Sequence, residues 1–169
     1  MLVFINQYGS LLQTGAIIIS AIAAVWLIIH NGRLSRKRAL IDLIIQQKNN
    51  ETLVRDTQLV FSLANKDNES LSKYAHLTDN DSSDKEFVEN RTAILNVLNN
   101  LEFIAVGIRM GAFDEKVYKQ LQCTNVLKIW KATAGFIHEL RKVSNRSTIF
   151  QDLEHLAHRW ESLPIKQIH

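Results

Sequence analysis

The sequence predicts an all-α protein in which one N-terminal transmembrane helix precedes a cytoplasmic bundle of about four helices. Three observations lead to this fold class. The first 32 of the 169 residues contain no Asp, Glu, Lys or Arg. The chain has one proline, Pro164, and six glycines, so little interrupts a helix. Further along the chain, apolar residues recur at the three- and four-residue spacing of helices and not in the alternation of strands.

Residues 11–29 form the predicted transmembrane helix. At about 1.5 Å per residue, this segment covers nearly the whole ~30 Å hydrocarbon thickness of a bilayer. Its apolar side chains point in every direction, because Ile17, Ile18 and Ile19 are consecutive. The remaining chain is too small to wrap such a helix as a soluble core. Tyr8 and Trp26 lie near its two ends, where aromatic side chains suit the membrane interfaces.

The positive charge of the chain is concentrated directly after this segment. Residues 33–48 hold five basic residues and one acidic residue, whereas the rest of the chain holds 15 basic and 16 acidic residues. This distribution argues against a uniformly basic nucleic-acid-binding protein. The positive-inside rule places residues 1–10 outside a bacterial inner membrane and the C-terminal domain in the cytoplasm. A cleaved signal peptide would carry its positive charge before the apolar core, so an uncleaved anchor is expected.

The basic residues next to the membrane have two interpretations. Determination of topology alone is enough to explain them, and contact with anionic lipid headgroups is an additional role. The residues concerned are Arg33, Arg36, Lys37 and Arg38.

The rest of the chain divides into a basic juxtamembrane helix at residues 30–48, a cytoplasmic helical domain at 49–163 and a tail at 164–169. Asn50 is expected to cap a helix over residues 51–64. Residues 65–85 are polar and predict a solvated linker with at most one short helical turn, around residues 71–77. Helices are expected over residues 86–110, from residue 115 to about 142, and from residue 148, where Thr148 and Gln151 match a capping box.

Glu102, Arg109, Asp114 and Tyr118 are the polar cluster that the sequence singles out. Asp114 suits the N-cap of the helix that follows the Gly111 turn. Glu102 and Arg109 lie at the edge of an apolar stripe that the helix at 86–110 is expected to turn toward the core, and both are expected to reach partners on neighbouring helices. The stripe consists of Ile94, Val97, Leu98, Leu101, Ile104, Ala105 and Ile108. The cluster is interpreted either as an ion-pair and capping network that fixes this corner, or as a polar recognition site for a partner or ligand.

No catalytic residue, cofactor or metal site is expected. The sequence contains no phosphate-binding loop, nucleophile elbow or zinc-protease motif. His155 and His158 are expected to face solvent, and the lone Cys123 is typical of an inert small residue.

The expected partners are the lipid bilayer and a protein of unknown identity, without nucleic acid. Ala16, Ser20 and Ala24 recur every four residues, a spacing that lets two membrane helices approach closely and form a homodimer. Small residues are also common in membrane helices, so chance is the preferred explanation of the spacing and the homodimer is the alternative.

One stretch carries a family resemblance. The pattern N-x-x-E-F-x-A-x-G-I-R-x-G-x-x-D-E-x-x-Y runs here from Asn99 to Tyr118, and it is followed by Trp130, FIHELR at 136–141 and LEHLAHRW at 153–160. With RKRALIDLIIQQKN after the apolar helix, the chain resembles a family of small bacterial and prophage membrane proteins that is a domain of unknown function. The resemblance covers roughly residues 10–162. It implies one membrane helix and a helical cytoplasmic domain, and it implies no reaction or cofactor.

Two functional hypotheses follow. The first is a membrane-anchored helical interaction, scaffold or regulatory module, which family analogy extends to the exclusion of competing phage. The alternative is a membrane-tethered enzyme or ligand sensor that uses the corner formed by Glu102, Arg109 and Tyr118.

Overall fold

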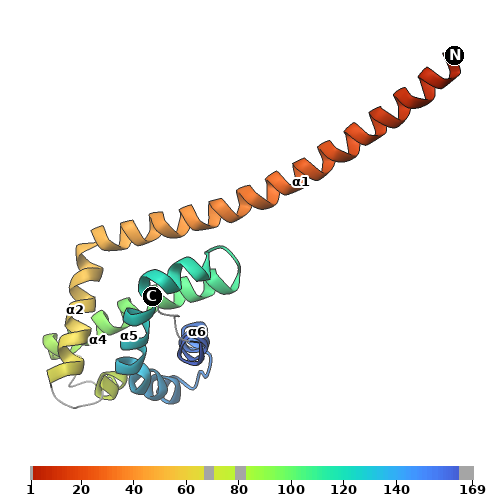
Figure 1. The fold of residues 1–169 in the computed structure, drawn as a ribbon. Coiled ribbons are helices and arrows are strands. Elements are labelled where there is room, and N and C mark those ends of the chain that lie inside the picture. Colours follow the sequence, from red (N-terminus) through yellow and green to blue (C-terminus); the bar gives the residue numbers. More distant parts are fainter. Residues whose placement is uncertain (1, 67–70, 79–82, 164–169) are drawn as a thin grey trace.

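The computed structural model describes residues 2–66, 71–78 and 83–163, with side chains from residue 12 onward; the predicted tail at 164–169 and the Tyr8 side chain lie outside this description. The described chain contains helices and no strand. Its elements are α1 (Leu2–Asn49), α2 (Glu51–Lys66), a 3-10 helix η1 (Leu71–Ala75), α4 (Lys85–Arg109), α5 (Glu115–Ser144) and α6 (Gln151–Ser162), shown in Figure 1. The predicted all-α fold, a long apolar N-terminal helix followed by a helical bundle, is confirmed.

Helix α1 is one unbroken helix that joins the predicted transmembrane segment to the predicted juxtamembrane helix. Its 48 residues extend about 72 Å at 1.5 Å per residue. Its N-terminal half projects away from the bundle (Figure 1). This helix is long and apolar enough to span a membrane, and none of its apolar window is buried inside the molecule. Ile17 and Ile28, for example, are 62% and 71% exposed.

The opposite end of α1 packs against the bundle. Leu40 is fully buried and Ile44 is 7% exposed. Gln47 donates from Nε2 to Oδ1 of Asn100 on α4 at 3.0 Å. Apolar packing and a cross-helix amide contact therefore both hold this end in place.

A tight corner then turns the chain from α1 into α2. As predicted, Asn50 forms the cap: its Oδ1 accepts a hydrogen bond from the Leu53 backbone N–H at 3.1 Å. Because Asn50 alone separates the two helices, the direction of α1 is closely tied to that of α2.

The core of the bundle forms where α4 meets α5 and α6. Every member of the predicted α4 stripe is buried: Ile94, Val97, Leu98, Leu101, Ile104, Ala105 and Ile108. The facing side chains of α5 and α6 include Val126, Ile129, Trp130, Phe136, Ile137, Leu153, Leu156 and Trp160. These stripes enclose one continuous apolar core.

The segment around η1 differs from the predicted solvated linker. Leu71, Tyr74 and Ala75 are buried in the core. Asn90 donates from Nδ2 to the Tyr74 hydroxyl at 3.2 Å, and the guanidinium of Arg91 donates to the backbone carbonyls of Tyr74 and Ala75. Burial lowers the pKa of Arg91. The sequence pattern did not predict this burial, because the segment lies between polar stretches and its five residues are too few to display a helical period.

The turn between α4 and α5 depends on two glycines. Gly111 has φ +70°, a left-handed conformation that suits glycine at the end of a helix. At Gly107, a Cβ atom would lie 2.3 Å from the Phe113 ring. The absence of a side chain at Gly107 therefore makes room for the ring of Phe113.

Candidate functional site

Glu102 acts as the N-terminal cap of α6 from a different helix. Its carboxylate accepts hydrogen bonds from the backbone N–H groups of Asp152 at 3.2 Å and Leu153 at 2.7 Å. The carboxylate also lies at the positive end of the α6 dipole. This contact replaces the predicted capping box of Thr148 and Gln151, which does not form.

The start of α6 explains that correction. Phe150, and not Thr148, occupies the N-cap position, with φ 56° and no side-chain cap of its own. The Phe150 side chain is buried in the core. Because the chain enters α6 through this buried left-handed residue, the local cap is lost and Glu102 satisfies the free N–H groups.

The other members of the predicted polar cluster also contact helix ends or the core. Arg109 donates from Nε to Oδ1 of Asp152 at 2.6 Å. Asp114 caps α5 by accepting from the Val117 N–H at 3.0 Å. The Tyr118 ring packs 5.7 Å from the ring of Trp160. The cluster therefore fixes α6 and the α4–α5 corner.

A hollow of about 310 Å³ lies beside Arg109, but it does not unite the cluster. Glu102 and Tyr118 are absent from its lining, and Arg109 already pairs with Asp152. A second lining cation, Arg159, pairs with Glu115 at 3.0 Å. This hollow is enclosed by ion pairs that connect helices, which leaves little unpaired charge for a ligand.

Contacts that the sequence could not indicate hold the rest of α6. Oε1 of Glu115 accepts from Trp160 Nε1 at 2.9 Å and from Arg159 Nε at 3.0 Å. Arg141 pairs from Nη1 with Glu154 at 2.8 Å and donates from Nε to the Ile149 carbonyl at 2.8 Å. A helix of 12 residues is thus attached to α4 and α5 by polar contacts along its length.

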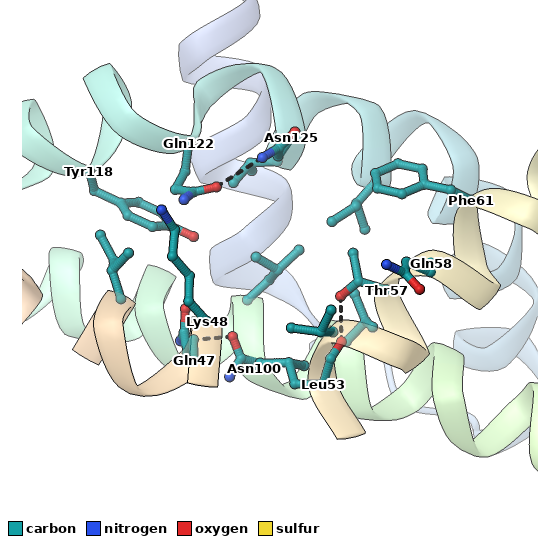
Figure 2. A pocket seen from close by; sticks show the side chains of 16 residues that line it. Gln47, Lys48, Leu53, Thr57, Gln58, Phe61, Asn100, Tyr118, Gln122 and Asn125 are labelled. Atoms are coloured by element: carbon teal, nitrogen blue, oxygen red, sulfur yellow. Dashed lines mark hydrogen bonds between the residues drawn. The ribbon is translucent and has the colours of Figure 1, made fainter. Parts of the chain in front are cut away.

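The better candidate site is a cavity of about 320 Å³ where α1, α2, α4 and α5 meet (Figure 2). This volume is at the lower end of the range of small-molecule pockets. Its apolar lining consists of Ile44, Leu53, Val54, Phe61, Val97, Leu101, Val126 and Ile129. Its polar lining consists of Gln47, Lys48, Thr57, Gln58, Asn100, Tyr118, Gln122 and Asn125.

The polar groups of the cavity are mostly amides that can donate and accept. Two amide pairs line it: Gln47 of α1 with Asn100 of α4 at 3.0 Å, and Asn125 with Gln122, both on α5, at 3.1 Å. Figure 2 shows both pairs, one on either side of the cavity. Such amides can exchange their mutual hydrogen bonds for bonds to a bound molecule.

Lys48 and Tyr118 lie together at one end of the cavity (Figure 2). Lys48 is the one charged side chain among the described residues that line it, and no carboxylate joins it. Burial raises the pKa of the Tyr118 phenol, so this group stays protonated at neutral pH. The cavity thus pairs an apolar wall with a cationic, hydrogen-bond-donating end.

The same groove continues between α2 and α5. A neighbouring hollow shares Phe61 and Asn125 with the cavity and adds Lys128 and Lys131, and its described lining contains no acidic residue. We call the cavity and this hollow together the α2–α5 groove. Sequence reasoning missed the groove, because its walls come from four helices and its lysines resemble ordinary surface charges.

The remaining candidates for chemistry lie apart from the groove. His155 and His158 are exposed on α6, and Cys123 is buried. Over residues 12–65, 71–78 and 83–163, no three His, Cys, Asp or Glu side chains gather where they could hold a metal ion.

One protein family matches almost the whole of this architecture. The family DUF4760, described as a domain of unknown function, matches residues 14–160. The chain belongs to this family. The DUF4760 match begins in the apolar half of α1 and ends at Trp160, so it includes the projecting helix as well as the bundle. No curated protein and no solved structure matches the chain significantly.

The capping role of Glu102 gives a direct test of the corner. We predict that Glu102→Ala lowers the free energy of unfolding by about 1–2 kcal/mol, because two N–H groups of α6 lose their acceptor. Thr148→Ala should have almost no effect, although a capping box would require Thr148. Thermal unfolding of the purified protein checks both, and equal losses in the two variants would contradict the cap described here.

Proposed function

We propose that this protein is a single-pass, membrane-anchored interaction module of the bacterial cytoplasmic membrane. The observation that carries the proposal is α1 itself, which is apolar and unburied in its N-terminal half and packed into the bundle at its other end. A core helix of a soluble protein would be buried by its own chain. Here the apolar half has no protein around it, and a bilayer supplies the missing apolar environment.

The cost of leaving this half in water supports the same proposal. Burying one large aliphatic side chain is worth about 1.5–3 kcal/mol. Among the exposed residues of α1 are Ile17, Ile18, Ile19, Ile22, Val25, Leu27, Ile28 and Ile29. Exposure of all of them would favour aggregation over a monomer in water.

The basic residues support an orientation with the N-terminus outside and the bundle in the cytoplasm. Arg33, Arg36, Lys37 and Arg38 are all exposed and follow the apolar half directly. They lie close to where α1 would leave the bilayer, so headgroup contact is compatible with their role in topology.

The α2–α5 groove suits a partner that carries negative charge on one side and apolar residues on another. Lys48, Lys128 and Lys131 provide three positive charges around an apolar floor that includes Phe61 and Ile129. An acidic amphipathic helix meets both requirements, because its apolar stripe fits a groove between two helices. We propose that a protein partner presents such a segment to the groove.

The second candidate function is a ligand sensor, and the end of the groove that Lys48 and Tyr118 form favours it over the Glu102 corner. A small amphiphile with one negative charge matches the apolar wall and the end formed by Lys48 and Tyr118. Gln47 and Lys48 come from α1, and Leu53 comes from α2. Occupancy would therefore stabilise the corner between the anchor and the bundle.

The orientation can be tested with reporter fusions at the C-terminus. We predict an active cytoplasmic reporter and an inactive periplasmic reporter. Replacing Arg33, Arg36, Lys37 and Arg38 by Glu should invert or abolish insertion, because it removes the positive-inside signal. Activity of the periplasmic reporter on the unaltered chain would overturn the proposed topology.

Photo-crosslinking distinguishes the two candidate functions of the groove. With a photoreactive residue at Gln58, we predict a crosslinked protein in membranes and a yield about tenfold lower in Lys128→Glu/Lys131→Glu, because both charges would repel an acidic partner. Lys116→Glu, an exposed lysine of α5 outside the groove, is the control. An unchanged yield in the double variant contradicts the proposed docking.

The sensor hypothesis predicts a different result. Octanoate, an anionic amphiphile of suitable size, should raise the Tm of the nanodisc-embedded protein by about 5 °C at roughly ten times its dissociation constant. Lys48→Gln should remove this shift. Absence of a shift in the unaltered protein excludes the sensor function for this ligand class.

A further inference from the structure

Beyond the bundle, α1 carries a second apolar face that nothing covers. Leu40, Leu43 and Ile44 pack against the bundle, whereas Leu34, Ile41 and Ile45 are 40%, 44% and 52% exposed. At about 100° per residue, the two sets lie about 130° apart round the helix. The bundle therefore leaves this face accessible along the whole cytoplasmic part of α1.

The spacing on this face is that of a coiled coil. Leu27, Leu34 and Ile41 are seven residues apart, and Ala24, Asn31, Arg38 and Ile45 form a second seven-residue series offset by three or four. The two series are the d and a positions of a heptad repeat. A repeat averaging 3.5 residues keeps one face against a like helix, whereas packing on a globular core needs no such register.

The identity of these residues favours two parallel strands. Two of the three d positions are leucine, Leu27 and Leu34, and the a positions include one asparagine, Asn31. Leucine at d and a single asparagine at a are features of parallel dimers. Arg38 is a second polar a-position residue, which lowers the stability of the pairing and restricts its register. Parallel alignment also follows from the shared orientation of anchored copies, and this step rests on the proposed membrane anchoring.

Charged residues flank the face in complementary positions. Lys37 occupies a g position and Asp42 the following e position. In a parallel dimer, the g residue of one helix reaches the e residue five positions later on the other, so Lys37 and Asp42 would pair twice by symmetry. Both side chains are exposed, and neither forms an ion pair with a described residue of its own chain.

We propose that two copies of this chain associate in parallel along this face of α1, from Ala16 to Ile45, which we call the α1 seam. Ala16, Ser20 and Ala24 extend the seam into the apolar half, where small residues let the two helices approach closely. The two bundles then lie outward of the paired helices.

Disulfide crosslinking in native membranes tests the seam. In a Cys123→Ser background, Leu34→Cys and Ile41→Cys place a thiol at d positions, where the two copies face each other closely enough for a disulfide. We predict oxidised dimers for both variants. Gln46→Cys, at an exposed b position of the same helix, is the matched control and should remain monomeric. Equal crosslinking at all three positions would indicate random collision and overturn the proposal.

A charge exchange tests the register. In the Leu34→Cys protein, Lys37→Glu should lower the dimer yield about threefold, because it faces Asp42 of the other copy. Adding Asp42→Lys should restore the yield, since the exchanged charges attract again. Failure of the second change to restore it would contradict the parallel register.

Membrane fractionation of the same samples separates this proposal from the anchoring on which it rests. Protein in the membrane fraction without crosslinks at Leu34→Cys and Ile41→Cys leaves the anchor intact and refutes the seam. Protein in the soluble fraction refutes the anchor. A crosslink at Leu34→Cys in that fraction would still support pairing through α1.

Discussion

Packing of the C-terminal part of α1 against the bundle is the interaction on which the rest of the structure depends. Leu40 and Ile44 bury their side chains, and Gln47 bonds to Asn100 on α4. Because the helix continues without a break toward the N-terminus, these contacts set the direction of the whole of α1, which is about 72 Å long. Without these contacts, the apolar half of α1 would be connected to the bundle through the backbone but would have no fixed direction relative to it.

Helix α1 contributes to several surfaces, because different residues lie on its different sides. One side fills the core, and Gln47 and Lys48 line the groove where α2 begins. The side remote from the core carries the exposed heptad residues of the proposed seam. These surfaces lie on one continuous helix, so the proposed anchor, the proposed seam and the groove share a structural element.

The features of the structure that could be predicted from the sequence were those whose patterns repeat over several turns of a helix. The α4 stripe was predicted correctly because seven apolar residues recur over four turns. The short helical turn of η1 was predicted, but its burial was missed because five residues show no period. The cap of α6 was misassigned because its acceptor, Glu102, lies 51 residues before Leu153. The groove was invisible because it exists only where four helices meet.

Continuity of α1 between the proposed membrane boundary and the bundle is the central claim, and hydrogen exchange of the membrane-reconstituted protein tests it most directly. An unbroken helix predicts slow amide exchange throughout residues 30–49, against fast exchange at residues 76–78, which lie outside any helix. Fast exchange within residues 30–39 would show a flexible hinge there. That result would contradict the rigid connection between anchor and bundle.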